Sequence, residues 1–187
     1  MNTSLLKEEQ QPSYAATNNL LGVAHDRIDS YTCRVIHTLF PPHTCGFAFF
    51  VGLLKNAIVK QCTLPDDLAD VRKDTAVVSM KGYAELSMRL GMSYDTTHMY
   101  LVIFRALGLL YIKRQEKKTE IIIPLHAYRP PDRLAETLWQ LLDHYRTKRP
   151  RVRRLVSNVI ERLVTLAQQA KCRRLKVERT VSVLVLS

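Results

Sequence analysis

The sequence lacks the motifs of the common enzyme classes. Its 187 residues include only six glycines, and these form neither a glycine-rich phosphate loop nor a Gly-x-Ser-x-Gly nucleophile turn. It also has no His-Glu-x-x-His motif, and no cluster of acidic residues of the kind that holds the metal ions of a nuclease. We therefore expect a protein that is not an enzyme and that carries no cofactor.

Long apolar runs are also missing. Four charged or amide side chains interrupt the most apolar window, residues 46–64, and make it too polar to cross a membrane. These are Lys55, Asn56, Lys60 and Gln61. We interpret the window as a buried amphipathic helix. Two glutamates within the first ten residues argue against a secretory signal, so we expect an intracellular protein without a membrane partner.

Cysteines are few, and in an intracellular protein they are expected to remain thiols. They are Cys33, Cys45, Cys62 and Cys172. Two of them, together with His37 and His43, form the pattern Cys-x3-His-x5-His-x-Cys over residues 33–45. This spacing matches no zinc finger or ribbon, and its first half lies in an otherwise apolar helix. We expect ordinary packing and no metal, although the sequence alone leaves metal binding by these four residues open.

Acidic residues are scarce in the second part of the chain. Residues 1–104 carry nine Lys or Arg against ten Asp or Glu, whereas residues 105–187 carry nineteen against seven. The net charge of +11 therefore comes from the second part. Such an excess indicates a polyanionic partner, most simply a nucleic acid and less simply an anionic membrane surface. A solvated basic face is the alternative reading.

Apolar periodicity predicts a mostly helical chain. Residues 1–26 are polar, show no such period, and are expected to form a flexible arm. Helices are predicted for residues 28–39, 47–64, 81–90, 93–107, 132–146 and 155–167. Strands are predicted for residues 75–80, 109–112, 120–125 and 177–187, and Ser79 is expected to cap the helix that follows it.

Two of these helices are separated by a very short turn. Gly91 is expected to end the first as a left-handed cap, and Ser93 is expected to cap the second, which ends at Gly108. The result is a helix-turn-helix, with the polar start of the second helix projecting from the surface. The next two strands are joined by KRQEKKT, residues 113–119, which predicts a hairpin with a basic tip.

The stretch YAELSMRLGMSYDTTHMYLVIFRALGLLYI, residues 83–112, resembles the winged helix-turn-helix superfamily of bacterial regulators and replication initiators. The similarity lies in the Gly-Met-Ser turn, the threonine-rich start of the second helix and the Ala-Leu-Gly-Leu-Leu exit before the wing. The preceding helices are similar in pattern to the N-terminal winged-helix domain of plasmid replication initiators. The resemblance implies a fold that is mainly α with a small β-hairpin, a winged helix-turn-helix flanked by N- and C-terminal helices.

This resemblance divides the chain into three parts. A flexible arm, residues 1–26, precedes a winged helix-turn-helix domain, residues 27–128. Residues 129–187 then form a basic helical extension that ends in a strand. The extension contains the run RTKRPRVRR, residues 146–154, for which a phosphate clamp and a localisation or RNA-binding segment are both open.

The function implied is non-catalytic binding of double-stranded DNA, as a transcriptional regulator or a replication initiator. Base contacts are expected from the start of the second helix, and backbone contacts from the wing and the basic run. The candidate DNA-binding residues are Lys81, Ser93, Tyr94, Asp95, Thr96, His98, Met99, Lys113, Arg114, Gln115, Lys117, Lys118, Arg149, Arg151, Arg153 and Arg154.

Other partners are also expected. A cytoplasmic, nucleoid-associated homodimer is one arrangement, with the apolar stripes after residue 132 at the interface or in contact with further proteins. Packing of those stripes on the winged helix within a monomer is the other. The alternative function is a winged-helix module for protein-protein interaction within a larger assembly.

Overall fold

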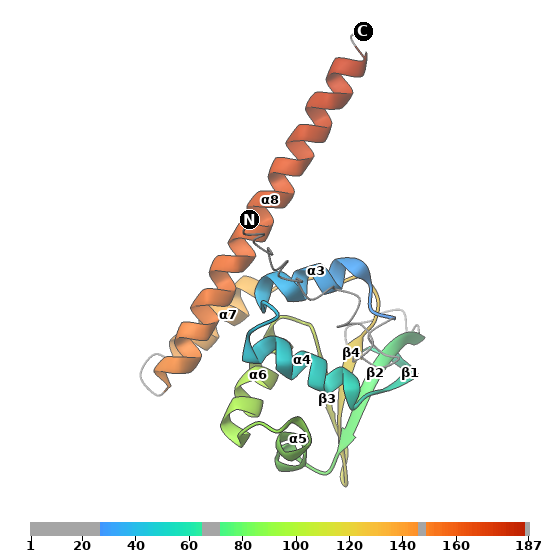
Figure 1. Cartoon of the computed structure of the whole chain (residues 1–187), viewed down its shortest axis with the longest axis vertical. Helices are drawn as coiled ribbons and strands as arrows, with labels where there is room; N and C mark the ends of the chain where they lie inside the picture. Colours follow the sequence, from blue (N-terminus) through green and yellow to red (C-terminus); the bar gives the residue numbers. More distant parts are fainter. Residues whose placement is uncertain (1–26, 65–71, 146–148, 186–187) are drawn as a thin grey trace, which may run out of the picture.

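The computed structural model describes residues 27–64, 72–145 and 149–185, with side chains described up to residue 171. The arm predicted for residues 1–26 lies outside this part, as do residues 146–148 of the basic run. The described residues form six helices and a four-stranded antiparallel sheet (Figure 1). Helix predominates, as predicted, but the sheet is larger than a single hairpin.

Two capped helices precede the sheet. Helix α3, Ser30–Leu39, begins where the Asp29 carboxylate accepts hydrogen bonds from the backbone amides of Tyr31 and Thr32, at 2.8 and 3.2 Å. Helix α4, Cys45–Lys55, begins at Thr44, whose hydroxyl accepts from the amide of Phe47 at 3.4 Å. Because the proline pair after α3 cannot continue a helix, the chain turns sharply between the two.

The predicted helix over residues 47–64 is wrong in its second part. Helix α4 ends at Lys55, and strand β1, Ile58–Thr63, pairs antiparallel with strand β2, Arg72–Met80. Asn56 ends the helix, and the sequence IVKQCT that follows is partly β-branched. Pairing with β2 gives its backbone groups hydrogen-bond partners outside the segment itself, which periodicity along the segment cannot reveal.

The remaining strands complete the sheet. Strands β3, Tyr111–Arg114, and β4, Thr119–Pro124, form the predicted hairpin, and the strand order is β1-β2-β4-β3. Strand β2 covers the predicted strand 75–80 and extends it at its start. Ser79 does not cap the next helix, because it lies within β2. There it is the cross-strand partner of Glu120 of β4, and its hydroxyl donates to the Glu120 carboxylate.

The two predicted helices joined by a short turn are present. Helix α5, Tyr83–Leu90, is followed by Gly91 in the left-handed conformation, φ 62°. Helix α6, Tyr94–Ala106, begins at the cap residue Ser93. Both caps were predicted from the sequence, because each depends on a local backbone requirement that only a few residue types meet.

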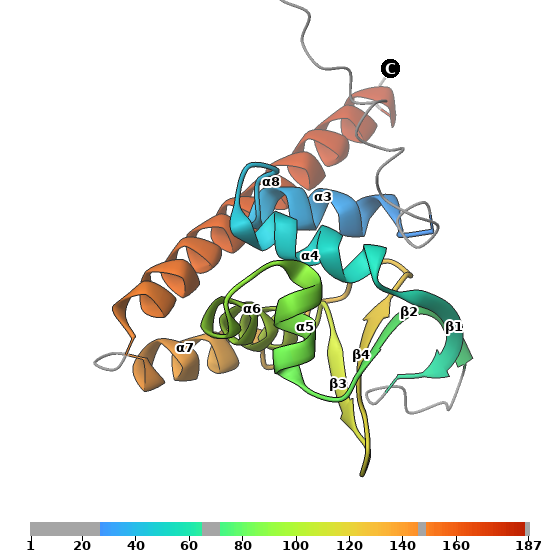
Figure 2. The same cartoon turned by 60° about the horizontal axis from the view of Figure 1, so that its bottom comes forward.

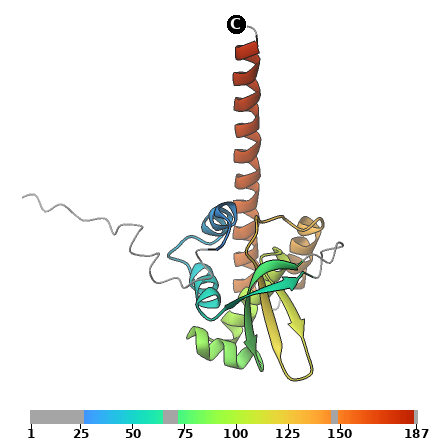
Figure 3. The same ribbon diagram turned by 90° about the vertical axis from the view of Figure 1, so that its right-hand side faces the viewer.

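Two helices follow the sheet. Helix α7, Leu134–His144, agrees with the predicted helix, and Pro150 opens helix α8, Pro150–Val185. The strand predicted for residues 177–187 is wrong up to residue 185, because the helix continues to Val185. A helix satisfies its backbone hydrogen bonds internally, whereas a terminal strand needs a partner edge. Figure 3 shows α8 extending well beyond the other elements.

The core lies between the sheet and the helices (Figure 2). At its centre Phe104 of α6 stacks with Phe40 and Phe50, with ring centroids 4.4 and 5.7 Å apart. The start of α8 joins this core through buried valines at Val152, Val156 and Val159. Further along α8, Arg162 Nη1 donates to the carbonyl of Leu39 at 2.6 Å. No helix in the described part of the chain is long and apolar enough to span a membrane.

Candidate nucleic-acid interface

The turn between α5 and α6 holds the start of α6 in place. The amide of Gly91 donates to the carbonyl of Met88 at 3.2 Å, and the amide of Met92 donates to that of Ser87 at 3.0 Å. Ser93 Oγ accepts from the amide of Thr96 at 3.2 Å. The same hydroxyl donates to Thr96 Oγ1 at 2.8 Å. Two of the predicted base-contacting residues, Ser93 and Thr96, therefore use their hydroxyls in the helix cap.

The more exposed candidates of this turn are Tyr94 and Asp95. Tyr94 is 52% exposed, and the side chain of Asp95 is 79% exposed. His98 and Met99 are partly buried. The rings of Tyr94 and His98 lie one helical turn apart and stack, with centroids 6.3 Å apart and an interplanar angle of 14°. The surface at the start of α6 thus carries an aromatic pair with a carboxylate beside it.

The hairpin is connected to this face by a contact that the sequence does not indicate. Arg114 of β3 lies with its guanidinium carbon 5.9 Å from the ring centroid of Tyr83, in the first turn of α5. Its Nη2 also donates to Tyr83 Oη at 3.5 Å, and this hydrogen bond raises the pKa of Arg114. The Tyr83 ring in turn lies edge-on to His98, with centroids 6.0 Å apart. Nothing in the sequence around Tyr83 indicates its polar contacts.

The start of α8 meets the start of α6. Arg149 Nη1 lies 3.5 Å from Asp95 Oδ1. Because both side chains are well exposed, this ion pair contributes little to stability, but it places the basic run beside the protruding turn. The other three predicted residues, Arg151, Arg153 and Arg154, are exposed in the first turns of α8.

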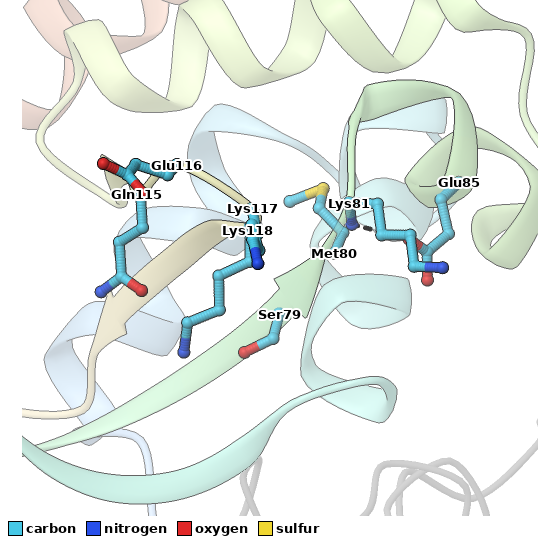
Figure 4. A pocket seen from close by; sticks show the side chains of 8 residues that line it. All are labelled: Ser79, Met80, Lys81, Glu85, Gln115, Glu116, Lys117 and Lys118. Carbon is cyan, nitrogen blue, oxygen red and sulfur yellow. Dashed lines mark hydrogen bonds between the residues drawn. The ribbon is translucent and has the colours of Figure 1, made fainter.

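The tip of the hairpin is a tight turn. The amide of Gln115 donates to the carbonyl of Lys118 at 2.8 Å, and the amide of Lys118 donates back to that of Gln115 at 3.3 Å. Glu116 and Lys117 therefore occupy the two outermost positions. An open cavity of about 670 Å³ lies between this tip and the turn from β2 to α5 (Figure 4). Its lining places Lys81, Lys117 and Lys118 around one hollow.

An acidic side chain partly neutralises one of these lysines. Lys118 Nζ lies 2.8 Å from Glu120 Oε1, and the hydrogen bond from Lys118 is the main cause that lowers the pKa of Glu120. Lys113 lies opposite the same glutamate in the register of β3 and β4.

The backbone amide of Lys81 donates to Glu85 Oε2 at 2.7 Å. This hydrogen bond is the largest cause of the lowered pKa of Glu85, which also contacts Arg89. The N-cap of α5 is Gly82, which has no side-chain cap, so the cap predicted for Ser79 is absent; the Glu85 carboxylate instead binds the amide that precedes the helix.

The residues of the possible metal pattern do not gather around one point. His37 packs edge-on against Phe47, with ring centroids 5.1 Å apart. The pKa of the Cys33 thiol is raised, first by burial and then by Asp29. Within the described residues, no group of three His, Cys, Asp or Glu is placed to hold a metal ion.

A second cavity, of about 860 Å³, lies toward the other end of the sheet. Apolar residues such as Ile36, Phe50 and Leu109 line it together with the rim residues Arg129 and Arg133. Its lining also includes Leu64 and Lys73, which come before and after residues 65–71, a segment outside the described part of the chain. The predicted DNA-binding residues of the hairpin tip line the other cavity, at the hairpin end of the sheet.

Comparisons of the chain with family models, with curated proteins and with solved structures find no match.

Proposed function

We propose that this protein binds double-stranded DNA without catalysis, through a winged helix-turn-helix, as a transcriptional regulator or replication initiator. The proposal is supported by the order of its elements. After α4 and β1, the elements in sequence are β2, α5, α6, β3 and β4, and in the sheet the last three strands lie in the order β2-β4-β3. A helix-turn-helix followed by a hairpin that pairs with the preceding strand is the arrangement a winged helix requires.

The observation that carries the proposal is the meeting of three basic or polar segments. The hairpin reaches α5 through Arg114 and Tyr83, and the start of α8 reaches α6 through Arg149 and Asp95. Segments separated in sequence thus border the protruding turn of α6. Positive side chains flanking a projecting helix start suit a duplex, whose phosphate backbones border the major groove.

In the proposed complex, the first turn of α6 enters the major groove. Tyr94 and Asp95 are the most accessible to base edges, and a carboxylate can accept a hydrogen bond from the amino group of cytosine. Lys117 at the tip of the wing and the arginines that open α8 contact phosphates on either side. Lys118 contributes less, because its ammonium group is already engaged by Glu120.

The test is the salt dependence of binding to a labelled random duplex, measured by fluorescence anisotropy and compared with a single strand of the same length. We expect tighter binding to the duplex, with an affinity that falls steeply as salt rises. Lys117→Gln should make the negative slope of log affinity against log salt shallower by about 1, and Lys118→Gln should make it shallower by less. Lys171→Gln, an exposed change further along α8, is the matched control and should leave the slope unchanged.

Sequence readout needs a separate comparison. Changes at Asp95, Thr96 or His98 should alter the preference among duplex sequences, whereas the change at Lys117 should weaken binding to all of them alike. Equal losses on every sequence for the α6 variants would contradict the assignment of α6 as the reading helix. Absence of duplex binding at moderate salt would contradict the proposal as a whole.

A second candidate function is protein-protein interaction, and one observation favours it. Trp139 of α7, the only tryptophan in the chain, is 66% exposed, and Val164 of α8 is 51% exposed. Exposed tryptophans are enriched at the energetic centres of protein interfaces. If the duplex does not bind, the exposed side chains of α7 and α8 are the next to test, first by substitution of Trp139.

A further inference from the structure

Arg114 differs from the other cations of the hairpin in the direction it faces. Alternate residues of a strand point to opposite faces of the sheet, so Arg114 shares a face with Ile112, whose side chain packs against the helix-covered core. Lys113 points to the other face, where its cross-strand neighbour is Glu120. Arg114 is therefore directed from the hairpin toward the helix-turn-helix, away from the side that carries Lys113.

The guanidinium of Arg114 has a partner on that side. It lies 5.9 Å from the ring centroid of Tyr83, a distance at which a cation is attracted to the face of an aromatic ring. Its Nη2 also donates to Tyr83 Oη at 3.5 Å. Because the hydrogen bond is long, it holds the guanidinium only weakly by itself. The contact with the ring adds to it.

Tyr83 continues the connection to the reading face. Its ring lies 6.0 Å from that of His98, and His98 stacks on Tyr94 at 6.3 Å. Arg114, Tyr83, His98 and Tyr94 thus form one chain of contacts from β3 through α5 to the first turn of α6. Side chains that join two elements in this way restrict how those elements move relative to each other.

We propose that Arg114 and Tyr83 form a strut that sets the position of the wing against α6, so that Arg114 is a positioning residue and does not contact DNA phosphates. The inference rests on the proposed DNA binding and makes it more specific. Lys117 and, to a lesser degree, Lys118 supply the phosphate contacts of the wing, while the strut decides whether the wing and α6 engage one duplex together. Loss of the strut should therefore reduce discrimination between sequences without reducing the number of phosphates contacted.

The first experiment uses the free protein and does not depend on DNA. Arg114 is exposed, as are Arg153 and Arg154 at the start of α8, so a difference between them would come from the contact of Arg114 with Tyr83. The heteronuclear ¹⁵N NOE of the Arg114 Nε–H group should be higher than those of Arg153 and Arg154. In Tyr83→Leu it should fall to their level, and in Tyr83→Phe it should lie between, because the ring remains. An Arg114 value equal to those of the exposed arginines in the unaltered protein would overturn the strut.

The second experiment uses duplex DNA. Arg114→Gln should leave the salt slope on random duplex unchanged and should lower the ratio of affinities for the preferred site and random duplex several-fold. Tyr83→Leu should give the same result, and the double variant should lose no more than either single change, because both remove one interaction. If Arg114→Gln instead makes the salt slope shallower by about 1, Arg114 contacts a phosphate directly and the proposal is overturned.

The two experiments separate the two ways of failing. If the unaltered protein does not bind duplex, the proposed function fails, and the NMR comparison still decides whether the strut exists. If the protein binds duplex, but Arg114 is mobile or Arg114→Gln makes the salt slope shallower, only the strut fails. Because Tyr83 is partly exposed, Tyr83→Leu is expected to fold. If it does not, Tyr83→Phe serves for the NMR comparison, and an unchanged thermal midpoint shows that this second variant is folded.

Discussion

At the scale of single residues, function and stability make different demands on the start of α6. Thr97 lies on the buried side of this helix, beside residues that we assign to DNA, and its side chain is fully buried. Its Oγ1 is the one buried side-chain polar atom in the described part of the chain that has no hydrogen-bond partner. Burying a hydroxyl without a partner costs about 1–3 kcal/mol.

Thr97→Val is therefore expected to stabilise the protein. Valine has nearly the shape of threonine and replaces the unpaired hydroxyl with a methyl group. We expect the free energy of unfolding to rise by about 1 kcal/mol, measured by urea denaturation. Thr165→Val serves as the control, because the hydroxyl of Thr165 is exposed and donates to the carbonyl of Glu161. A lower stability for Thr97→Val would mean that the hydroxyl has a partner in solution.

Residue-scale prediction succeeded where the cause was local. Gly91 and Ser93 were identified as helix caps because a left-handed backbone and an orphan amide each select few residue types. The partnership of Tyr83 and Arg114 could not be predicted, since the two lie 31 positions apart and meet only when the hairpin folds over α5. The same reason hid the pairing of Arg149 with Asp95.

At the scale of elements, one loop anchors three of them. Tyr128 follows β4, and its backbone amide donates to Thr32 Oγ1 of α3 at 2.8 Å. Its phenol donates to the carbonyl of Leu107, at the end of α6, also at 2.8 Å. Burial of this phenol is the main cause that raises the pKa of Tyr128 to about 12.

This anchor predicts a loss of stability at alkaline pH. The pKa of Tyr128 in the folded protein, about 12, lies above the value of about 10 for an unfolded tyrosine. Its contribution is therefore complete below about pH 10 and is lost as the pH rises toward 12. The free energy of unfolding should fall over this window, and the fall should be smaller in Tyr128→Phe. Tyr94→Phe, at an exposed phenol, is the control; an equal fall in all three proteins would contradict the assignment.

The two errors in element assignment have a common origin. The segments over β1 and over the end of α8 each contain β-branched and apolar residues that suit either structure. In β1 the neighbouring strand β2 decided for a strand. At the end of the chain the residues continue a helix that is already nucleated, which adds one hydrogen bond for each residue fixed.

At the scale of the whole molecule, α8 both completes the domain and extends beyond it. Its buried residues lie near its start, and the last of its described apolar residues packed against the core is Leu166. Residues 167–171 that follow are exposed. Figures 1 and 3 both show the rest of α8 leading away from the sheet. Roughly the first five turns of the helix therefore hold it to the domain.

A chain shortened to residue 171 tests this division. We expect it to keep the thermal midpoint of the full protein, because the described core contacts of α8 end before the cut. Its binding to random duplex should also persist, since the arginines placed beside α6 are retained. Circular dichroism melting and the anisotropy titration measure the two expectations. As a control, Val156→Ala should lower the midpoint, because it removes a fully buried side chain. A large drop on shortening would show that the end of α8 supports the domain.

The sequence by itself determined the features that depend on a few neighbouring residues: the helix caps, the turn between α5 and α6, the hairpin with its basic tip, and the concentration of positive charge in the second part of the chain. Only the tertiary structure decided that β1 is a strand, that Lys118 is engaged by Glu120 while Lys117 stands at the tip, and that Arg114 faces Tyr83. The physical reason is that helix caps and turns are settled by interactions over three or four residues. Strand pairing and the environment of a charge depend instead on groups that folding brings together from distant parts of the chain.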